Sequence, residues 1–590
     1  MNNTISTFSK YPISLSLALL LSACPGNNNT SSIPNGKIDT QDAAAKNSQP
    51  AASRNVTIIG TADVHGHVEM LPLFGGYVDI LRSDKTRTVL LIDGGDMFQG
   101  TLASNLREGA PIVAAYNLLK YDAVTIGNHE FDFGPVGDDS TVTNPGQDPR
   151  GALKARAASA NFPFLSSNIL DSDGKPVHWP NVHPATLIES GGVLVGIIGV
   201  STIETPRVTL AENVVGLSMA PLVTSITQYA VDLRTRGAEL VIVAAHAGGD
   251  CKSFDNPKDL QSCDKSQEIF EVASGLPKDL VDVIVAGHTH RAVAHEVNGI
   301  AIIESYALSR SFGRVDIRLS PAGKIENVKI HPPKAMCLGP DKPGPDCDAG
   351  EYEGVKVGRN AALTAIANDA AAVAEQLRSK ELGIVLSSDI ERSRGSASPL
   401  GNLFADLILE AQPTADIAMV NGGSLRAPLP KGPLVYGELF EALPFDNRFA
   451  LVTMRGRELR KIFSTNLGRD NGLISISGVR VAAKCQSGSL VVTMTRAKGK
   501  GKKGRVIRDN DLVVVATSDF LASGGDGLIG EGGAQVEKSS VVGSIGIRDG
   551  MAALLTRRGG TLDPTLKSLF DPKNPRVRYP GQRPVVCGAK

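Results

Sequence analysis

The sequence predicts an α/β protein of two domains with functional side chains gathered at the ends of buried strands. The chain has 590 residues, and a single hydrophobic core stops growing at roughly 250 to 300 residues. Short apolar runs alternate with helical stretches, as in βαβ units. Five of these runs end in Asp, Asn or His, and ligands bind at the carboxyl ends of strands in α/β sheets.

The composition is that of a globular protein, with 42% hydrophobic and 21% charged residues. Basic and acidic residues number 61 each, so the formal net charge is zero. Such a balance provides no global field to recruit a nucleic acid polymer or an anionic membrane. We therefore expect an anionic substrate to be held by a local site.

The N-terminus has the pattern of a targeting segment. Lys10 precedes an apolar run over residues 13–21, too short for a transmembrane helix, and the run closes on Leu21-Ser22-Ala23-Cys24. This ending resembles the lipobox of bacterial lipoproteins, in which Cys24 becomes lipidated; an ordinary secretory signal with an accidental Cys is the alternative. We expect a signal peptide over 1–23, a flexible tether over 24–53, and a periplasmic or cell-surface protein of a bacterium that is attached to a membrane only through Cys24.

Export makes disulfides possible among the six cysteines that follow Cys24. The short separations favour Cys251 with Cys263 and Cys337 with Cys347, which leaves Cys485 for Cys587. Other connectivities remain open, because sequence alone does not determine pairing. The absence of a CxxC pair argues against a zinc ribbon or a thioredoxin-like role.

The side chains at the five strand ends are of the metal-binding type. The runs and the residues that follow them are 56–59 with Asp63 and His65, 88–92 with Asp96, 124–126 with Asn128, His129 and Asp132, 240–245 with His246, and 280–286 with His288 and His290. One histidine alone is more often structural, but five of the chain's 10 histidines stand at these ends. This coincidence predicts a metal site, whereas His67, His178, His183, His295 and His331 are expected not to be ligands.

The ligand types indicate the kind of metal centre. Carboxylate, amide oxygen and imidazole without thiolate suit two divalent ions such as Zn, Mn or Fe. Seven ligands exceed the needs of one ion, and Asp96 could bridge a pair about 3.5 to 4 Å apart. The ligand candidates are Asp63, His65, Asp96, Asn128, His246, His288 and His290.

His129 follows a ligand and is expected to face away from it. It would donate a hydrogen bond to a phosphate or protonate the leaving oxygen. Asp132 either holds this imidazole in the required tautomer or merely caps the following turn.

The five strand ends carry five short motifs, namely Asp63-Val64-His65, Gly95-Asp96, Gly127-Asn128-His129-Glu130, His246-Ala247-Gly248 and Gly287-His288-Thr289-His290. These motifs follow one another in the order typical of calcineurin-like metallophosphoesterases, which this chain resembles. Gly127 to Asp132 resembles the 5'-nucleotidase and UDP-sugar hydrolase branch in particular. The resemblance implies that Asp63, His65, Asp96 and His290 bind one ion, that Asp96, Asn128, His246 and His288 bind the other, and that His129 and Asp132 form a catalytic dyad. One departure is Ala62, where the family often has Asn.

The resemblance also implies the domain organisation. It places a four-layer αββα metallophosphoesterase sandwich at 54–350, a linker helix at 356–380, and a C-terminal α/β nucleotide-binding domain at 381–590. The Ala-rich stretch 360–379 is itself helical in character, with a hinge expected near Ala370. A second amphipathic helix is predicted at 400–411 and strands at 417–420 and 512–517.

The second half offers two aromatic rings, Phe445 and Phe520, on loops that look exposed. They either sandwich a flat base or belong to the core at strand ends. The NGGxxR, LPF and FLAxGGDG motifs resemble those of 5'-nucleotidases, which implies that both rings stack the base. The same resemblance assigns substrate-binding roles to Arg394, Asn421, Gly423, Arg426, Asn447 and Asp526, with Arg392 as a further candidate. Arg426 would bind the terminal phosphate or the ribose region, and Asp526 and Asn447 the nucleoside.

A basic, Gly-rich run at 496–508 lies outside this pattern and is either a solvated hairpin loop or a patch for polyanions. The sequence thus predicts an exported, dinuclear-metal hydrolase that removes the 5'-phosphate of nucleotides and acts as a monomer or dimer. The alternatives are a UDP-sugar or 2',3'-cyclic nucleotide phosphodiesterase, a thiosulfohydrolase-like enzyme and, least favoured, a non-catalytic nucleotide-binding lipoprotein.

Overall fold

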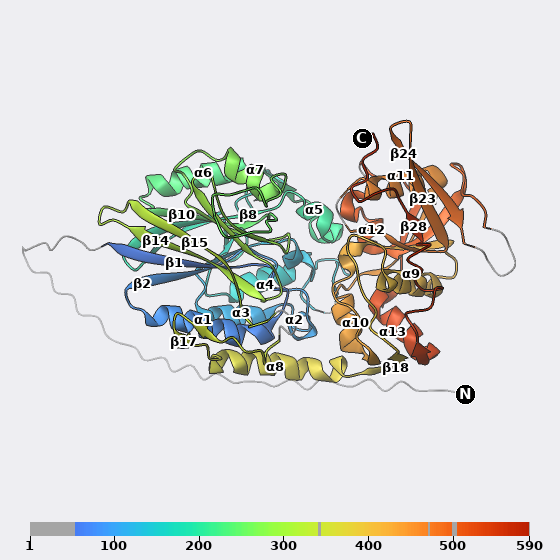
Figure 1. The fold of residues 1–590 in the computed structure, drawn as a ribbon, viewed down its shortest axis with the longest axis horizontal. Coiled ribbons are helices and arrows are strands. Elements are labelled where there is room, and N and C mark those ends of the chain that lie inside the picture. Colours follow the sequence, from blue (N-terminus) through green and yellow to red (C-terminus); the bar gives the residue numbers. More distant parts are fainter. Residues whose placement is uncertain are drawn as a thin grey trace, which may run out of the picture. The chain divides into compact units, whose positions relative to one another are not determined.

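Two large sheets lie face to face in the N-terminal lobe of the protein (Figure 1). The computed structural model describes residues 53–137, 139–339, 344–469, 472–497, 504–530 and 532–588. The predicted signal peptide, Cys24, nearly all of the tether and the middle of the basic run, 498–503, lie outside the described residues. The rest falls into one compact unit.

The first sheet has seven strands and the second has six. The order in the first is β15 (Ile325–Ala335), β14 (Ser311–Leu319), β1 (Arg54–Thr61), β2 (Arg87–Asp93), β3 (Ala123–Thr125), β4 (Phe164–Leu165) and β6 (Val182–His183). The order in the second is β12 (Ala292–Val297), β13 (Ile300–Ser305), β11 (Val283–Ala286), β10 (Leu240–His246), β8 (Val193–Ser201) and β7 (Ala185–Ser190). In the first sheet, β14 and β15 are antiparallel to their neighbours, and the other strands pair in parallel. In the second sheet, the edge strands β12 and β7 are antiparallel to their neighbours, and the strands between them pair in parallel.

Helices cover the outer face of each sheet, so the lobe has four layers, αββα, as predicted. The helices α1 (Leu71–Ser83), α3 (Ala110–Leu119) and α4 (Gly151–Ser159) share one apolar cluster with the seven-stranded sheet. The helices α6 (Leu222–Thr235) and α7 (Glu268–Gly275) share another with the six-stranded sheet. A third cluster fills the space between the sheets.

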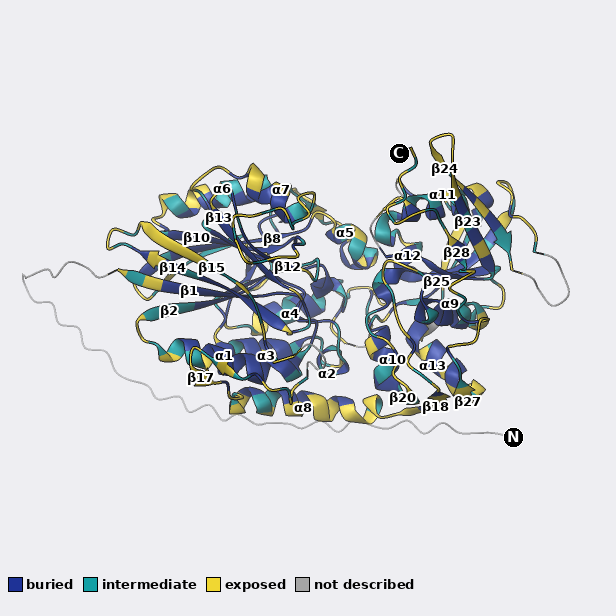
Figure 2. Cartoon of the chain, viewed as in Figure 1, coloured by how far each residue is buried: buried dark blue, intermediate teal, exposed yellow. Residues whose placement is uncertain are grey.

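The central strands are apolar along most of their length because both of their faces are buried. In β10, Ile242 and Ala244 point into the cluster between the sheets, while Val241 and Val243 point to the helical side. Figure 2 shows β8 and β10 in the colour of buried residues along most of their length. The continuous apolar runs of the sequence therefore correspond to doubly covered strands.

Shorter elements complete this lobe. They are η1 (Val68–Met70), α2 (Leu102–Asn105), η2 (His129–Phe131), β5 (Ile169–Leu170), α5 (Thr205–Val208), η3 (Ala211–Asn213), β9 (Ser218–Met219), β16 (Glu351–Tyr352) and β17 (Val355–Lys356).

The predicted connector is the helix α8 (Ala361–Arg378). The Asn360 side chain caps its start by accepting hydrogen bonds from the backbone N–H groups of Ala362 and Leu363. Leu363 and Ala370 pack into the core of the N-terminal lobe, whereas Ala374 packs into that of the C-terminal lobe. Ala370 lies inside this continuous helix, and the hinge there stays a prediction.

The C-terminal lobe contains one five-stranded and two three-stranded sheets. The larger has the order β22 (Ser475–Ser477), β19 (Ile417–Val420), β25 (Leu512–Ser518), β21 (Arg448–Arg455) and β26 (Lys538–Gly546). The smaller ones are β20 (Gly432–Val435), β18 (Glu381–Leu386) and β27 (Gly560–Leu562), and β24 (Ser489–Arg496), β23 (Val479–Gln486) and β28 (Val577–Arg578). The helices are α9 (Pro399–Ala411), η4 (Gly422–Ser424), α10 (Tyr436–Ala442), α11 (Gly456–Leu467), α12 (Asp519–Ala522), η5 (Gly525–Gly527) and α13 (Ile547–Arg558).

Three disulfides form, and they are the favoured pairs. They join Cys251 to Cys263, Cys337 to Cys347 and Cys485 to Cys587. Among the helices of the described ranges, none is long and apolar enough to cross a membrane.

Candidate active site

The carboxyl ends of β1, β2 and β3 in one sheet and of β10 and β11 in the other deliver all seven predicted metal ligands to one place. The two sets of strands are parallel within their sheets, so their carboxyl ends point the same way. The ligand-type side chains gather into two neighbouring groups, Asp63 with His65 and His290, and Asp96 with His246 and His288.

In the first group, imidazole nitrogens and a carboxylate face one another. The Nε2 atoms of His65 and His290 are 3.0 Å apart, and Asp63 Oδ1 lies 3.5 Å from His290 Nε2. His65 Nδ1 is 2.8 Å from the carbonyl oxygen of Gln99, which is a partner for an N–H on that atom. This bond leaves the Nε2 lone pair available to a metal ion.

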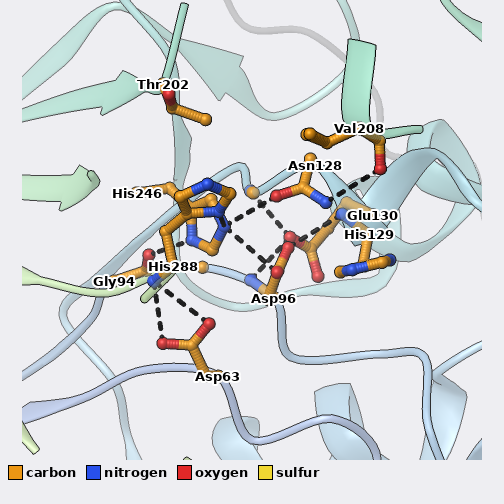
Figure 3. A network of polar contacts seen from close by, with 12 residues as sticks. Asp63, Gly94, Asp96, Asn128, His129, Glu130, Thr202, Val208, His246 and His288 are labelled. Carbon is orange, nitrogen blue, oxygen red and sulfur yellow. Dashed lines mark hydrogen bonds and ion pairs between the residues drawn. The ribbon is translucent and has the colours of Figure 1, made fainter. Parts of the chain in front are cut away.

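In the second group, His246 stands at the centre (Figure 3). Its Nε2 lies 3.1 Å from Asp96 Oδ2, 3.0 Å from Asn128 Oδ1 and 3.2 Å from His288 Nδ1. Its Nδ1 is 2.8 Å from the carbonyl oxygen of Gly94. Four potential ligand atoms of the right chemical types therefore converge.

Asp96 lies between the groups. Its Oδ2 is 3.1 Å from His246 Nε2 and 3.9 Å from His65 Nε2, so one carboxylate reaches both sets. The donor set of carboxylates, one amide and imidazoles fits two divalent ions with Asp96 as the shared ligand.

Five of the seven candidate ligands have left-handed backbone conformations, which only glycine adopts at low cost. The residues and their φ values are Asp63 (52°), His65 (48°), Asp96 (57°), His288 (84°) and His290 (57°). β1 ends at Thr61, so Asp63 and His65 lie beyond the extended strand. The side chains nevertheless converge.

Glycine permits the closest approach of the loops. A Cβ atom on Gly127 would lie 2.2 Å from Asp96 Oδ1, so a larger residue there would displace a candidate ligand.

Burial sets the charge state of most of the ligand side chains. The pKa of His65 and that of His290 are lowered well below the usual value, chiefly by burial, and that of His288 is lowered to about 3. These rings are therefore neutral, the form that binds metal. Burial would also lower the pKa of His246, but the charge of Asp96 raises it to about 10, so a proton competes with a metal ion for this ring.

Two buried glutamates connect the loops that carry the ligands. Glu130 accepts hydrogen bonds from the backbone N–H groups of Asp96, Met97 and Gly127, at 2.7 to 2.8 Å. Glu304 in β13 accepts one from Gly249 N, at 2.7 Å, and one from the hydroxyl of Thr289, at 2.6 Å. Each carboxylate thus holds two ligand loops together.

The predicted dyad is a direct hydrogen bond. His129 Nδ1 and Asp132 Oδ2 are 2.6 Å apart, and the Thr209 hydroxyl donates to the other Asp132 oxygen at 3.1 Å. Burial alone would lower the pKa of His129, but Asp132 and Asp96 raise it above its usual value. Asp132 therefore contacts the ring as expected of an orienting partner.

Two side chains of the C-terminal lobe reach His129. Arg426 donates a hydrogen bond from Nη2 to His129 Nε2, at 3.1 Å. The centre of the Phe445 ring lies 5.6 Å from the centre of the His129 ring and 5.1 Å from the guanidinium carbon of Arg426. Burial lowers the pKa of both Arg426 and His288, and the charge of Arg394 contributes to lowering each, so this guanidinium is also close to the site.

The other predicted substrate residues form a second polar group. The amide of Asn421 donates to Asp526 at 3.1 Å, and Gly423 lies beside this amide. Asn421 and Asn447 both line a small cavity of about 20 Å³.

Phe520 is not an exposed ring. Only 9% of its surface is accessible, and it packs in the core of the C-terminal lobe with Gly525 directly against its ring. Of the two alternatives that the sequence left open, the core position therefore holds for Phe520 in this structure. Phe445 is half-buried.

Of the histidines expected not to be ligands, His67 pairs with Glu69 and His331 with Asp316. His295 lies 3.8 Å from Cys263, which is engaged in a disulfide.

Sequence reasoning missed four supporting residues, namely Gln99, Thr209, Glu130 as a loop anchor, and Glu304. Glu130 stands inside the Gly127 to Asp132 motif, and Glu304 is a charge that ends an apolar strand, so both left a signal. Gln99 donates from its side chain to Pro444 O at 2.6 Å, a contact across 345 residues that no local pattern indicates.

Two family models match the chain. The one described as calcineurin-like phosphoesterase matches residues 56–292, and the one described as 5'-nucleotidase, C-terminal domain, matches residues 372–531.

Relatives of known name are similar over most of the chain. A snake venom 5'-nucleotidase from Crotalus adamanteus is 25% identical over 538 residues, which cover 81% of this chain and 82% of the relative. The endonuclease YhcR of Bacillus subtilis is 27% identical over 79% of this chain, which spans 35% of the length of YhcR. The structure of a 5'-nucleotidase precursor from Thermus thermophilus has a TM-score of 0.69 and 22% identity, with coverage of 89% of this chain and 99% of that one, and shows the same fold.

Proposed function

Because the chain belongs to the family that joins a calcineurin-like metallophosphoesterase domain, a hydrolase, to a 5'-nucleotidase C-terminal domain, we propose that it removes the 5'-phosphate of nucleotides. Two divalent ions would be held by Asp63, His65, Asp96 and His290 and by Asp96, Asn128, His246 and His288. When bound, such a pair supplies an activated water and charge stabilisation for a phosphoryl displacement.

One observation carries the proposal of a nucleotide as substrate. Arg426 and Phe445 come from the C-terminal lobe, yet both stand at His129 beside the candidate ligands. A cation that binds phosphate and a ring that stacks on a base are thereby adjacent to a phosphoryl-transfer site. A phosphate ester that carries a flat base matches this combination.

His129 can exchange a proton at Nε2 while Nδ1 stays bonded to Asp132. Arg426 can only donate, so His129 Nε2 accepts from it and the ring is neutral in this arrangement. A phosphate that draws Arg426 onto itself would free Nε2, and a protonated Nε2 then donates to the phosphate or to the leaving oxygen. The Asp132 carboxylate stabilises the imidazolium during this step.

Arg394 would act with Arg426 on the phosphate or the ribose region, and Asn421, Gly423, Asn447 and Asp526 complete the proposed substrate site on the nucleoside side. Phe520 supports its loop from within the core, and its stacking on a base would require the side chain to become accessible. The proposed setting is outside the cytoplasm, after cleavage before Cys24 and lipidation of that residue. Three disulfides support an oxidising compartment.

The test is a substrate panel with the Mn-loaded and the Zn-loaded protein. Phosphate release from AMP is compared with hydrolysis of UDP-glucose, of a 2',3'-cyclic nucleotide and of a thiosulfate ester on a carrier peptide. We expect the highest kcat/KM with AMP. A protein that binds metal but turns over no nucleotide would contradict the proposal. A higher kcat/KM with UDP-glucose or with the cyclic nucleotide than with AMP would instead indicate a phosphodiesterase.

A further inference from the structure

Arg548 is a buried cation whose N–H groups donate to the loop at residues 443–446 and to Tyr436 in α10, the helix that precedes this loop. It lies in the first turn of α13 with 7% of its surface accessible. Its Nη1 donates to the carbonyl oxygens of Leu443 and Phe445, both at 3.2 Å, and its Nη2 donates to Asp446 Oδ1 at 2.5 Å. Its Nε donates to the hydroxyl of Tyr436 at 3.0 Å.

The guanidinium is also stacked and remains charged. Its central carbon lies 4.2 Å from the centre of the Phe440 ring in α10. Burial would lower the pKa of Arg548, but the carboxylate of Asp446 and the hydroxyl of Tyr436 raise it above its usual value. A planar, permanently charged fork is therefore held in one orientation.

The loop that it binds, residues 443–447, carries Phe445. This loop connects α10 to β21 and lies outside regular secondary structure, so its backbone carbonyls need other partners. Arg548 satisfies two of them from one side, and Gln99 satisfies that of Pro444 from the other. The backbone N–H of Ile547 adds a hydrogen bond to Asn447 O, at 2.8 Å.

The hydrogen bonds of Arg548 go to Tyr436 and to residues 443–446, and none goes to a candidate metal ligand or to His129. Its charge is matched by Asp446, which is about half exposed and could be solvated without it. What the arrangement fixes is the backbone on both sides of Phe445, whose ring stands 5.6 Å from that of His129.

We propose that Arg548 is a positioning residue for nucleoside recognition, which holds residues 443–446 so that the ring of Phe445 faces the base of the substrate. The inference rests on the proposed nucleotide function and adds a residue that makes no contact with the substrate. A positioning role predicts a selective defect for substrates that possess a base.

The experiment compares AMP with ribose 5-phosphate, which lacks the base, as substrates of the metal-loaded protein. Arg548→Lys keeps the charge but replaces a planar fork that makes four hydrogen bonds with a compact ammonium that has three donors. We expect KM for AMP to rise about tenfold with little change in kcat, whereas both constants for ribose 5-phosphate stay within about twofold of the wild type. Arg558→Lys, an exposed substitution at the end of the same helix, is the matched control and should change neither KM nor kcat for either substrate.

A double-mutant cycle tests whether Arg548 acts through Phe445. Phe445→Ala removes the ring, so adding Arg548→Lys to it should raise KM for AMP no further. Additive effects, or equal losses with AMP and ribose 5-phosphate, would overturn the inference, because either would indicate a general structural role.

Adenosine binding, measured by calorimetry, provides a readout that does not depend on turnover. We expect Arg548→Lys to weaken adenosine about tenfold, and equal affinity in the variant and the wild type would overturn the inference. Absence of AMP hydrolysis by the wild type would instead refute the proposed function, and the two failures are thus distinguished.

Discussion

Replacement of Glu130 by Gln removes one of the two carboxylates that tie the ligand loops together. Glu130 Oε2 accepts hydrogen bonds from Asp96 N and Gly127 N, and Oε1 accepts from Met97 N and, at 3.3 Å, from Phe98 N. Gln has one acceptor oxygen and one NH₂ group. In either amide orientation, the NH₂ group faces two backbone N–H donors and leaves them without an acceptor.

The size of the effect follows from these counts. Each buried donor left unsatisfied costs about 1–3 kcal/mol, so the loops that carry Asp96 and Asn128 lose roughly 2–6 kcal/mol of local stability. Loss of a partner that orients metal ligands typically weakens metal binding about 10- to 100-fold. Because Asp96 would be the ligand shared by the two proposed ions, we expect weaker binding of both.

Calorimetric titration of the metal-free protein with Mn²⁺ measures this directly, and metal analysis gives the stoichiometry. Glu271→Gln is the control, since Glu271 is exposed in the same lobe and should leave both dissociation constants unchanged. If Glu130→Gln bound two Mn²⁺ ions with the constants of the wild type, the loops would not depend on this carboxylate and the reasoning would be refuted.

Three further predictions concern the dyad, the aromatic ring and the disulfides. Asp132→Asn removes a carboxylate that raises the pKa of His129, so the ring loses its proton at a lower pH. The alkaline limb of the pH profile of kcat should therefore move to lower pH. An unmoved limb would mean that Asp132 only caps the turn. Phe445→Ala should raise KM for AMP about tenfold, the expected loss of stacking on one base, and a nucleotide KM equal to that of the wild type would exclude the stack. Removal of the Cys485–Cys587 bridge, with a sequence separation of 102, should lower the free energy of unfolding in urea by about 4.7 kcal/mol. Removal of the Cys337–Cys347 bridge, with a separation of 10, should lower it by about 2.7 kcal/mol. Equal effects would argue against the loop-entropy explanation.

The sequence was most informative where both faces of a strand are buried and a polar loop follows. The run that became β10 and the motif from Gly127 to Asp132 are examples, since each strand is buried throughout and the change of composition marks its end. The α8 and α9 helices were predicted within two residues of their bounds because their amphipathic period and capping signals agree.

Other features depend on contacts that local patterns do not record. β15 is an edge strand with mostly exposed residues, so it lacks the buried face that produces an apolar alternation. Asp63 and Asp96 have left-handed conformations, and their backbone N–H groups donate to Gly95 O and to Glu130 Oε2, which belong to other loops. Arg548 and Phe445 are separated by 103 residues, and neither position alone indicates the other.

The central claim is that both lobes build one site, in which Arg426 acts on the phosphate beside His129. The most direct test is the rate of phosphate release from AMP by Arg426→Met, with bound metal measured in the same sample. The account predicts a loss of at least about 100-fold in kcat/KM with the metal content unchanged, as for removal of a charged group that stabilises a transition state. A rate equal to that of the wild type would contradict it.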